Sequence, residues 1–284
     1  MTEQELLARL LPHLARSGGD VLIGAGEDDS AAWLEPDGTC TVASCDCSVE
    51  HVHFDLARQD PEDVGWRALA LALGDLAAKG AEPTFGLAAI AIPPGWGEDV
   101  VEGIYRGMAG LAGETGLRLV GGDTSSSPAT GAVFLTVLGR AARRPLPRSA
   151  ARSGWLIGVT GPLGGASPAT RRPRPLIRRG VELNAAGLCC GDISDGLLRE
   201  LDKFAAVSGT GAELELARVP VAEGADPIAA LGNGEEVELV CVGPGPLPEG
   251  LHEVGRLTGD GRVRVLDASG GEVTVAYRGY DHAL

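Results

Sequence analysis

Five short segments of this chain combine aspartate with glycine or serine, and each stands where a run of apolar residues ends. A carboxylate is costly to remove from water unless it is paired or binds a metal ion. Any fold for this sequence must therefore leave the five segments in solvent or gather their carboxylates around bound cations. The segments are Gly26–Ser30, Ser44–Cys47, Gly74–Asp75, Gly121–Thr124 and Asp192–Gly196.

Each segment alone also has an ordinary structural explanation, because aspartate, serine and glycine are favoured at helix N-caps and in turns. Asp75 is harder to explain in this way. A helical period places it on one face with Val64, Ala68, Leu71 and Ala72, so it is either a buried cap or part of a site. The five segments together favour a site for a hard cation such as Mg²⁺, which binds carboxylate and phosphate oxygens. Adjacent backbone N–H and hydroxyl groups could then face the phosphates.

The charge balance excludes several classes of partner. The chain has 24 lysines and arginines against 39 aspartates and glutamates, a formal net charge of −15, which argues against nucleic acid as its main partner. It contains no uncharged apolar run of about 18 residues, so we expect no membrane span. The amphipathic N-terminal sequence lacks the basic start and apolar run of a signal peptide. The six cysteines form no CxxC pair and indicate reduced thiols, so we expect a soluble, cytoplasmic protein.

Apolar periodicity predicts helices and strands without strict strand–helix–strand alternation, a pattern that favours an α+β or mixed α/β fold. A length of 284 residues corresponds to roughly two average domains. The basic, proline-containing stretch Arg143–Arg148 is the best linker candidate. We therefore expect an N-terminal domain over residues 1–142 and a C-terminal α/β domain over residues 143–284. Residues Gly161–Pro175 are rich in glycine, proline and arginine and are expected to form a loop.

The individual elements follow from the same patterns. Helices are expected over Gln4–Ala15, Pro61–Lys79, Asp99–Thr115 and Gly196–Val207. Strands are expected over Thr39–Ala43, Thr84–Ile92, Ala132–Gly139, Trp155–Thr160, Ala212–Leu216, Val237–Val242, Arg262–Leu266 and Val273–Tyr277.

The order and spacing of the acidic segments resemble those of the thiamine-monophosphate kinase family, within the superfamily that includes aminoimidazole-ribonucleotide synthetase. The resemblance runs along nearly the whole chain, and the shared order of its motifs is specific. The matching segments are Glu27–Ala31, Ser44–Cys47 with Val49–Phe54, Leu73–Pro83, Gly121–Thr124, Asp192–Leu197 and Gly279–His282.

The resemblance implies an ATP-dependent kinase that converts thiamine monophosphate to thiamine diphosphate by direct in-line transfer with Mg²⁺. It also implies a homodimer whose N-terminal domains pair their sheets into a shared barrel, with ATP near the domain junction. The physical chemistry agrees, because two anionic phosphates must approach one another and bridging cations neutralise their repulsion. Two other functions stay open: an enzyme of the same superfamily that acts on another small acceptor, or a homologue that binds a nucleotide without turnover.

The same resemblance assigns roles to residues of this chain. The catalytic aspartates would be Asp75, Asp123 and Asp195. The metal ligands would be Asp29, Ser44, Cys45, Asp46, Asp75, Asp123, Asp192 and Asp195. ATP would contact Tyr105, Gly122, Asp123, Arg148 and Ser194, and thiamine monophosphate would contact His53, Glu235 and Tyr277. Arg148 could instead be a solvated linker charge, His53 a packed or surface imidazole, and Tyr277 a half-buried residue at a strand end.

Several positions depart from the family pattern. Cys45 and Cys47 stand where the family commonly has threonine, and thiolates match Mg²⁺ poorly, although their backbone carbonyls could still serve. Glu236 replaces an aspartate, Val237 an aromatic residue and Tyr277 a tryptophan. These changes leave the aspartates intact and bear on which substrate the protein accepts.

Overall fold

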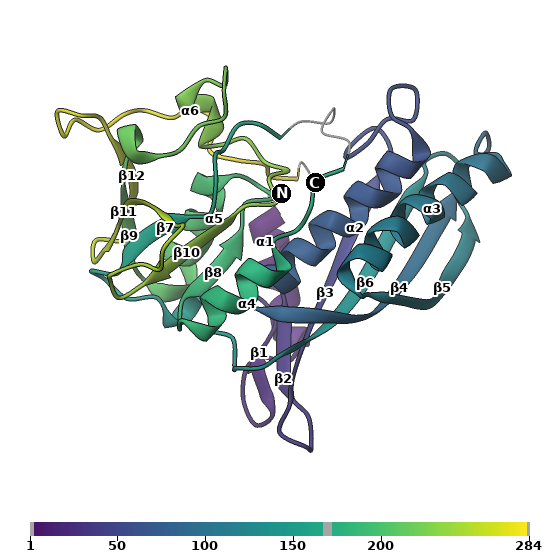
Figure 1. Ribbon diagram of the computed structural model, residues 1–284, viewed down its shortest axis with the longest axis horizontal. Helices are drawn as coiled ribbons and strands as arrows, with labels where there is room; N and C mark the ends of the chain where they lie inside the picture. The colour runs from purple at the N-terminus through teal and green to yellow at the C-terminus, as the bar shows by residue number, and fades with distance from the viewer. Residues whose placement is uncertain (1–2, 167–171, 283–284) are drawn as a thin grey trace.

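The computed structural model describes residues 3–166 and 172–282, which form two six-stranded sheets with helices packed against them (Figure 1). Both sheets are mixed, since each contains one parallel pair of strands among antiparallel pairs. The expected mixed α/β fold is thereby confirmed. Neither sheet closes into a barrel within the described part of a single chain. None of the helices in these two ranges is long and apolar enough to cross a membrane.

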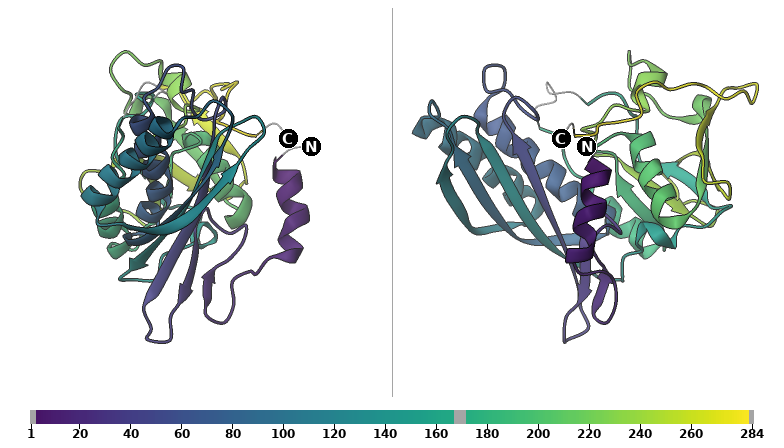
Figure 2. Two further views of the ribbon diagram at one scale, coloured as in Figure 1. Left: turned by 90° about the vertical axis from the view of Figure 1, so that its right-hand side faces the viewer. Right: turned by 180° about the vertical axis from the view of Figure 1, so that it is seen from behind.

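The first sheet has the strand order β1-β2-β3-β6-β4-β5. Its strands are β1 (Val21–Ile23), β2 (Ala31–Leu34), β3 (Cys40–Val49), β4 (Ala81–Ile92), β5 (Arg118–Ser126) and β6 (Ala132–Ala141). Helices α2 (Pro61–Ala78) and α3 (Glu98–Thr115) cover one face, and α1 (Glu3–Leu10) lies on the other side of the sheet (Figure 2). Strands β4 and β5 are parallel because α3 connects them as a crossover.

The second sheet has the strand order β12-β9-β11-β7-β10-β8. Its strands are β7 (Leu156–Val159), β8 (Cys189–Asp192), β9 (Gly211–Glu215), β10 (Leu239–Gly243), β11 (His252–Thr258) and β12 (Val263–Leu266). The helices described in this half are α4 (Ile177–Ala185), α5 (Leu197–Ser208) and the short α6 (Pro227–Ala230). Short 3₁₀ turns lie at Leu11–His13, Arg148–Ala150 and Leu216–Arg218. Part of the expected loop Gly161–Pro175, residues 167–171, lies outside the described residues.

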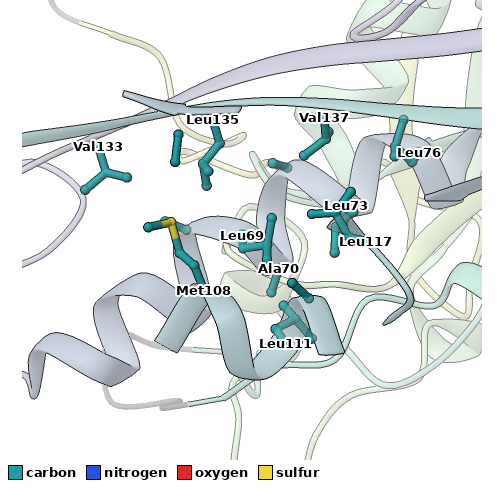
Figure 3. Close-up of a cluster of buried hydrophobic side chains, with 14 of the residues drawn as sticks. Leu69, Ala70, Leu73, Leu76, Met108, Leu111, Leu117, Val133, Leu135 and Val137 are labelled. Carbon is teal, nitrogen blue, oxygen red and sulfur yellow. The ribbon is translucent and has the colours of Figure 1, made fainter. Parts of the chain in front are cut away.

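Helix α2 joins the two halves of the molecule. Its N-terminus is capped by the Asp60 side chain, which accepts a hydrogen bond from the Glu62 N–H, and Pro61 occupies the first turn. Leu69 and Leu73 are fully buried between β6 and α3 (Figure 3). The helix also contacts α4 and β8 of the second half. Its last turns therefore lie against the second sheet, where the helix carries Asp75.

Helices α2 and α3 approach so closely that the contact requires glycine. A Cβ atom at Gly107 would lie 1.9 Å from the carbonyl oxygen of Glu62, whereas a Cβ at Gly113 of the same helix meets no atom within 4 Å. We expect Gly107→Ala to lower the free energy of unfolding by about 1–3 kcal/mol, the usual cost of overpacking. Gly113→Ala should raise it by up to about 1 kcal/mol, because alanine is the better helix former. Urea unfolding of both variants checks this, and equal effects would contradict the close approach.

The face of the first sheet opposite α2 and α3 carries exposed apolar side chains on three adjacent strands. Phe85 and Leu87 of β4, Val120 of β5 and Phe134 of β6 are between 39% and 58% exposed. Strand β5 is exposed along almost its whole length. Large apolar patches of this kind mark interaction surfaces in soluble proteins.

The structure differs from the sequence predictions in several places. Strands β1, β2, β8 and β11 and the short helix α6 were not expected. The expected strand Val273–Tyr277 is wrong, because the only ladder contact next to it is an isolated bridge of Glu272 to β12. Strand β5 was not expected, since its glycines and polar residues do not show strand alternation. Helix α4 was not expected either, because it follows a proline-rich stretch. The helix predicted over Gln4–Ala15 ends at Leu10, where a 3₁₀ turn that contains Pro12 begins.

Candidate active site

A cavity of about 650 Å³ opens between the first sheet and the loops of the second. Its walls come from β3, α2, the end of β8, α5, the loop after α6 and the C-terminal segment. Most residues that the sequence indicated for the site line this one cavity: Asp29, Ser44, Cys45, Asp46, His53, Asp75, Asp192, Ser194, Asp195, Glu235 and Tyr277. The fold thus brings together segments that are far apart in the sequence.

Three aspartates from distant segments meet in this cavity. One carboxylate oxygen from each of Asp29, Asp75 and Asp192 lies within 4.8 Å of the other two. Asp75 and Asp192 are buried, and Oδ1 of Asp192 has no hydrogen-bond partner among the described residues. The Ser44 hydroxyl donates to Oδ2 of Asp75. An orphaned carboxylate oxygen beside two other carboxylates is a donor set that fits a hard divalent cation such as Mg²⁺.

Burial and mutual repulsion raise the pKa of the clustered carboxyls. Burial, followed by the charges of Asp192 and Asp29, raises the pKa of Asp46 to about 7. Burial, with the charges of Asp29 and Glu200, also raises the pKa of Asp192 to about 7. Burial and the charges of Asp192 and Asp46 raise the pKa of Asp75 well above its ordinary value. A cation favours the charged form of each group, so these carboxyls are suited to exchange protons for a metal ion.

Two cationic side chains, Arg148 and Lys203, lie beside Asp29. Burial acts to raise the pKa of Asp29, but the charges of Arg148 and Lys203 outweigh it and hold that pKa below its ordinary value. The Lys203 Nζ atom lies 2.9 Å from Oδ2 of Asp195, 3.4 Å from Oδ1 of Asp29 and 3.4 Å from Oε2 of Glu200. The sequence reasoning missed Lys203, because a lysine in an amphipathic helix normally belongs to the solvent-facing side.

Arg148 is buried and is not a solvated linker charge. Its guanidinium pairs with Asp29, and its Nε donates to Oε1 of Glu200 at 2.6 Å. Its Nη1 atom also lies 3.4 Å from Asp28, whose carboxylate accepts a hydrogen bond from the buried Lys79 ammonium at 2.7 Å. Arg148 therefore holds acidic side chains beside the cavity, and its contact with ATP stays a prediction.

The expected substrate contacts form another wall of the cavity. His53, Glu235 and Tyr277 all line it. Glu235 has a left-handed backbone conformation, with φ of 66°, and its carboxylate pairs with the buried Arg67 of α2. The His53 ring lies 5.6 Å from the ring of His282, in the C-terminal segment that also lines the cavity. A carboxylate beside aromatic faces suits a flat cationic ring.

Some of the residues that depart from the family pattern line the cavity, and others do not. Cys45 and Cys47 are exposed and line the cavity. Glu236 is buried and points away from the substrate wall, since its Oε1 accepts a hydrogen bond from the Gly164 N–H at 2.7 Å. Val237 does not line the cavity either. Of the altered substrate-segment residues, only Tyr277 faces the cavity.

Three residues expected to contact ATP lie together outside the cavity. Gly122 of β5 pairs with Ala88 of β4, and the Tyr105 hydroxyl donates to the Ala88 carbonyl at 3.2 Å. Asp123 follows on the exposed strand β5. Within a single chain these three residues form a separate group from the one around Asp75.

The fold and the site together define a class of protein: a two-sheet mixed α/β protein that gathers carboxylates in a ligand-sized cavity. Residues 27–141 match the family described as AIR synthase related protein, N-terminal domain. The thiamine-monophosphate kinase of Methanopyrus kandleri is 33% identical over 93% of this chain and 92% of its own. That of Escherichia coli strain K12 is 30% identical over 99% of this chain and 98% of its own. The chain belongs to the thiamine-monophosphate kinase family, which confirms the resemblance seen in the sequence.

Solved structures share the fold. AaThiL complexed with AMPPCP and TMP superimposes with a TM-score of 0.81 at 24% identity, covering 99% of this chain and 97% of that one. The protein tt0281 of Thermus thermophilus gives a TM-score of 0.78 at 26% identity, covering 96% of this chain and 98% of that one.

Proposed function

We propose that the protein transfers the γ-phosphoryl group of ATP to thiamine monophosphate and so forms thiamine diphosphate. The observation that carries this proposal is the convergence of Asp29, Asp75 and Asp192 in a cavity that Glu235 and Tyr277 also line. The names of the relatives, and the neighbour complexed with AMPPCP and TMP, support the same reaction. A cytoplasmic location agrees with six free cysteines.

Mg²⁺ fits the donor set of the cavity. Of the residues expected to hold it, Asp29, Ser44, Asp46, Asp75, Asp192, Asp195 and Cys45 line the cavity, whereas Asp123 does not do so within a single chain. When bound, Mg²⁺ neutralises the phosphate charge and lets the two phosphates approach. The chain itself positions the carboxylates and sets the polarity of their surroundings. The side chains of Asp75 and Asp192 are buried, and electrostatic interactions of buried groups are stronger than those in water.

The substrate wall would recognise the rings of thiamine monophosphate. The carboxylate of Glu235, held by Arg67, would face the positive charge of the thiazolium ring. Tyr277 and His53 would offer aromatic faces to the two flat rings. With the rings held there, the phosphate of the substrate would have to reach the aspartates for in-line transfer.

The reaction is tested by incubating the purified protein with ATP, Mg²⁺ and thiamine monophosphate and separating the products by chromatography. We expect thiamine diphosphate and ADP in equal amounts, and no product in EDTA or with thiamine in place of its phosphate. A folded protein that gives no thiamine diphosphate at any Mg²⁺ concentration would reject the proposal. Turnover with another acceptor alone would indicate a different enzyme of the superfamily, and calorimetric ATP binding without turnover would indicate a non-catalytic homologue.

We also propose that the chain acts as a homodimer in which two copies of the first sheet form a shared barrel. The exposed apolar residues Phe85, Leu87, Val120 and Phe134 support this, because a second copy would remove them from water. The exposed strand β5, which carries Gly122 and Asp123, would then lie at the interface.

Leu87→Asp is expected to convert the dimer into a monomer, because it places a charge in an apolar interface. Ile228→Asp is the matched control, since Ile228 is comparably exposed but lies in α6 of the second half. Size-exclusion chromatography with light scattering distinguishes the mass of two chains from that of one. A wild-type monomer, or an L87D dimer, would contradict the proposed interface.

A further inference from the structure

The Lys203 ammonium occupies a position surrounded by acidic groups. It lies 2.9 Å from Oδ2 of Asp195 and 3.4 Å from oxygens of both Asp29 and Glu200. Glu200 is almost fully buried, while the Lys203 side chain is 25% exposed and lines the cavity. Asp29 and Asp195 come from opposite halves of the chain, so Lys203 bridges the two halves at the edge of the site.

The carboxylates of the cavity fall into two groups with different counter-charges. Asp29 and Asp195 pair with Lys203, and Asp29 pairs with the buried Arg148 as well. In contrast, Asp75 and Asp192 form no ion pair with any residue in the ranges 3–166 and 172–282. The orphaned Oδ1 of Asp192 lies on this unpaired side. Asp29 and Asp195 therefore have resident counter-charges, whereas Asp75 and Asp192 are left to protons or to cations from solution.

We propose that Lys203 is a resident cation of this site: its ammonium occupies the space between Asp29 and Asp195 that a divalent ion would otherwise occupy. It is a positioning residue, because it fixes both carboxylates before any metal ion or triphosphate binds. This inference rests on the proposed divalent-cation site, but it concerns the distribution of charge there and not the identity of the acceptor.

The proposal has a physical consequence that a simple surface ion pair would not have. Removing a positive charge that lies about 3 Å from two ligand carboxylates strengthens the local negative potential and favours divalent cations. An ordinary exposed ion pair contributes little, and its loss would leave metal binding unchanged. The affinity for a divalent ion therefore distinguishes the two roles.

The test is a titration of the full-length protein with Mn²⁺ alone, with free Mn²⁺ measured by electron paramagnetic resonance. We expect Lys203→Gln to bind Mn²⁺ about tenfold more tightly than wild type, or to bind one more ion per chain. Lys203→Arg, which keeps the charge, should bind as wild type does. Arg218→Gln is the control, because Arg218 pairs with Glu215 and Glu253 on the exposed surface of the second half. An unchanged or weaker Mn²⁺ isotherm for K203Q would overturn the proposal.

Thermal unfolding gives a second measurement that is independent of the Mn²⁺ titration. In EDTA, K203Q should unfold at a lower temperature than wild type, because Asp29, Asp195 and Glu200 lose a counter-charge. Mn²⁺ should then raise the unfolding temperature of K203Q by more than it raises that of wild type or R218Q. Equal Mn²⁺-induced shifts in all three proteins would contradict the role of Lys203. Neither measurement involves ATP or an acceptor, so failure of the proposed kinase reaction would be seen separately.

Discussion

Asp75→Asn is expected to lower kcat for thiamine diphosphate formation by about 10³-fold, the scale of losing one key electrostatic group in an active site. The Asp75 carboxylate lies within 4.8 Å of those of Asp29 and Asp192, so the substitution removes one of three converging ligands. Asparagine keeps the shape of the side chain, and the Ser44 hydroxyl can still donate to its amide oxygen. Steady-state kinetics at several Mg²⁺ concentrations measure the loss.

The stability of this variant separates a site residue from a structural one. Because burial and neighbouring charges raise the pKa of Asp75, removing its carboxyl relieves repulsion. In EDTA, D75N should therefore unfold at the same temperature as wild type or higher. Asp99→Asn, in the exposed first turn of α3, is the control and should keep full activity. Wild-type kcat in D75N, or a large loss of stability in EDTA, would show that the buried aspartate is a structural cap.

Lowering the pH from 8 to 6 is expected to weaken Mn²⁺ binding to the protein by at least about 100-fold. The pKa values of Asp46 and Asp192 are raised to about 7. Both carboxyls are mostly charged at pH 8 and mostly protonated at pH 6, and a protonated carboxyl must lose its proton before it binds a metal ion. Each group then contributes roughly a tenfold change in affinity over this range.

The same titration in Asp192→Asn provides the comparison. This variant lacks one of the two groups, and the pKa of Asp46 loses the raising effect of the Asp192 charge. The change in its weaker Mn²⁺ binding between pH 8 and pH 6 should therefore be at least about tenfold smaller than in wild type. Calorimetry at pH 8, 7 and 6 in buffers of equal ionic strength measures both proteins. An affinity that does not depend on pH in wild type would mean that these carboxyls do not bind the metal ion.

Much of the site was predictable because its residues interrupt the local pattern. A carboxylate on the apolar face of a helix identified Asp75, and the order of the glycine–aspartate segments identified Asp29 and Asp192. Lys203 could not be found in this way, because its position fits the polar face of an amphipathic helix. Its role depends on its contact with Asp29, which lies in the other half of the chain. The roles of individual site residues, including Arg148 at ATP, stay predictions.

The fold was predictable where burial follows a regular period and was missed where it does not. Strand β5 is almost entirely exposed in the single chain, so no apolar alternation marks it. In the wrongly predicted strand Val273–Tyr277, Val273 and Val275 do pack against the second core, yet only the Val273 N–H bonds to β12. Alternation predicts which side chains are buried, but not whether a neighbouring strand is in reach. The domain boundary at residue 142 falls between the two sheets and stays a prediction.

The central claim is that separate acidic segments jointly hold divalent cations against a phosphate. It is tested most directly by crystallising the protein with Mn²⁺, a non-hydrolysable ATP analogue and thiamine monophosphate, and recording anomalous scattering at the manganese edge. We expect an anomalous peak within ligand distance, about 2.0–2.3 Å, of carboxylate oxygens from both Asp75 and Asp192. Bound nucleotide and substrate without any manganese peak beside these two aspartates would contradict the account.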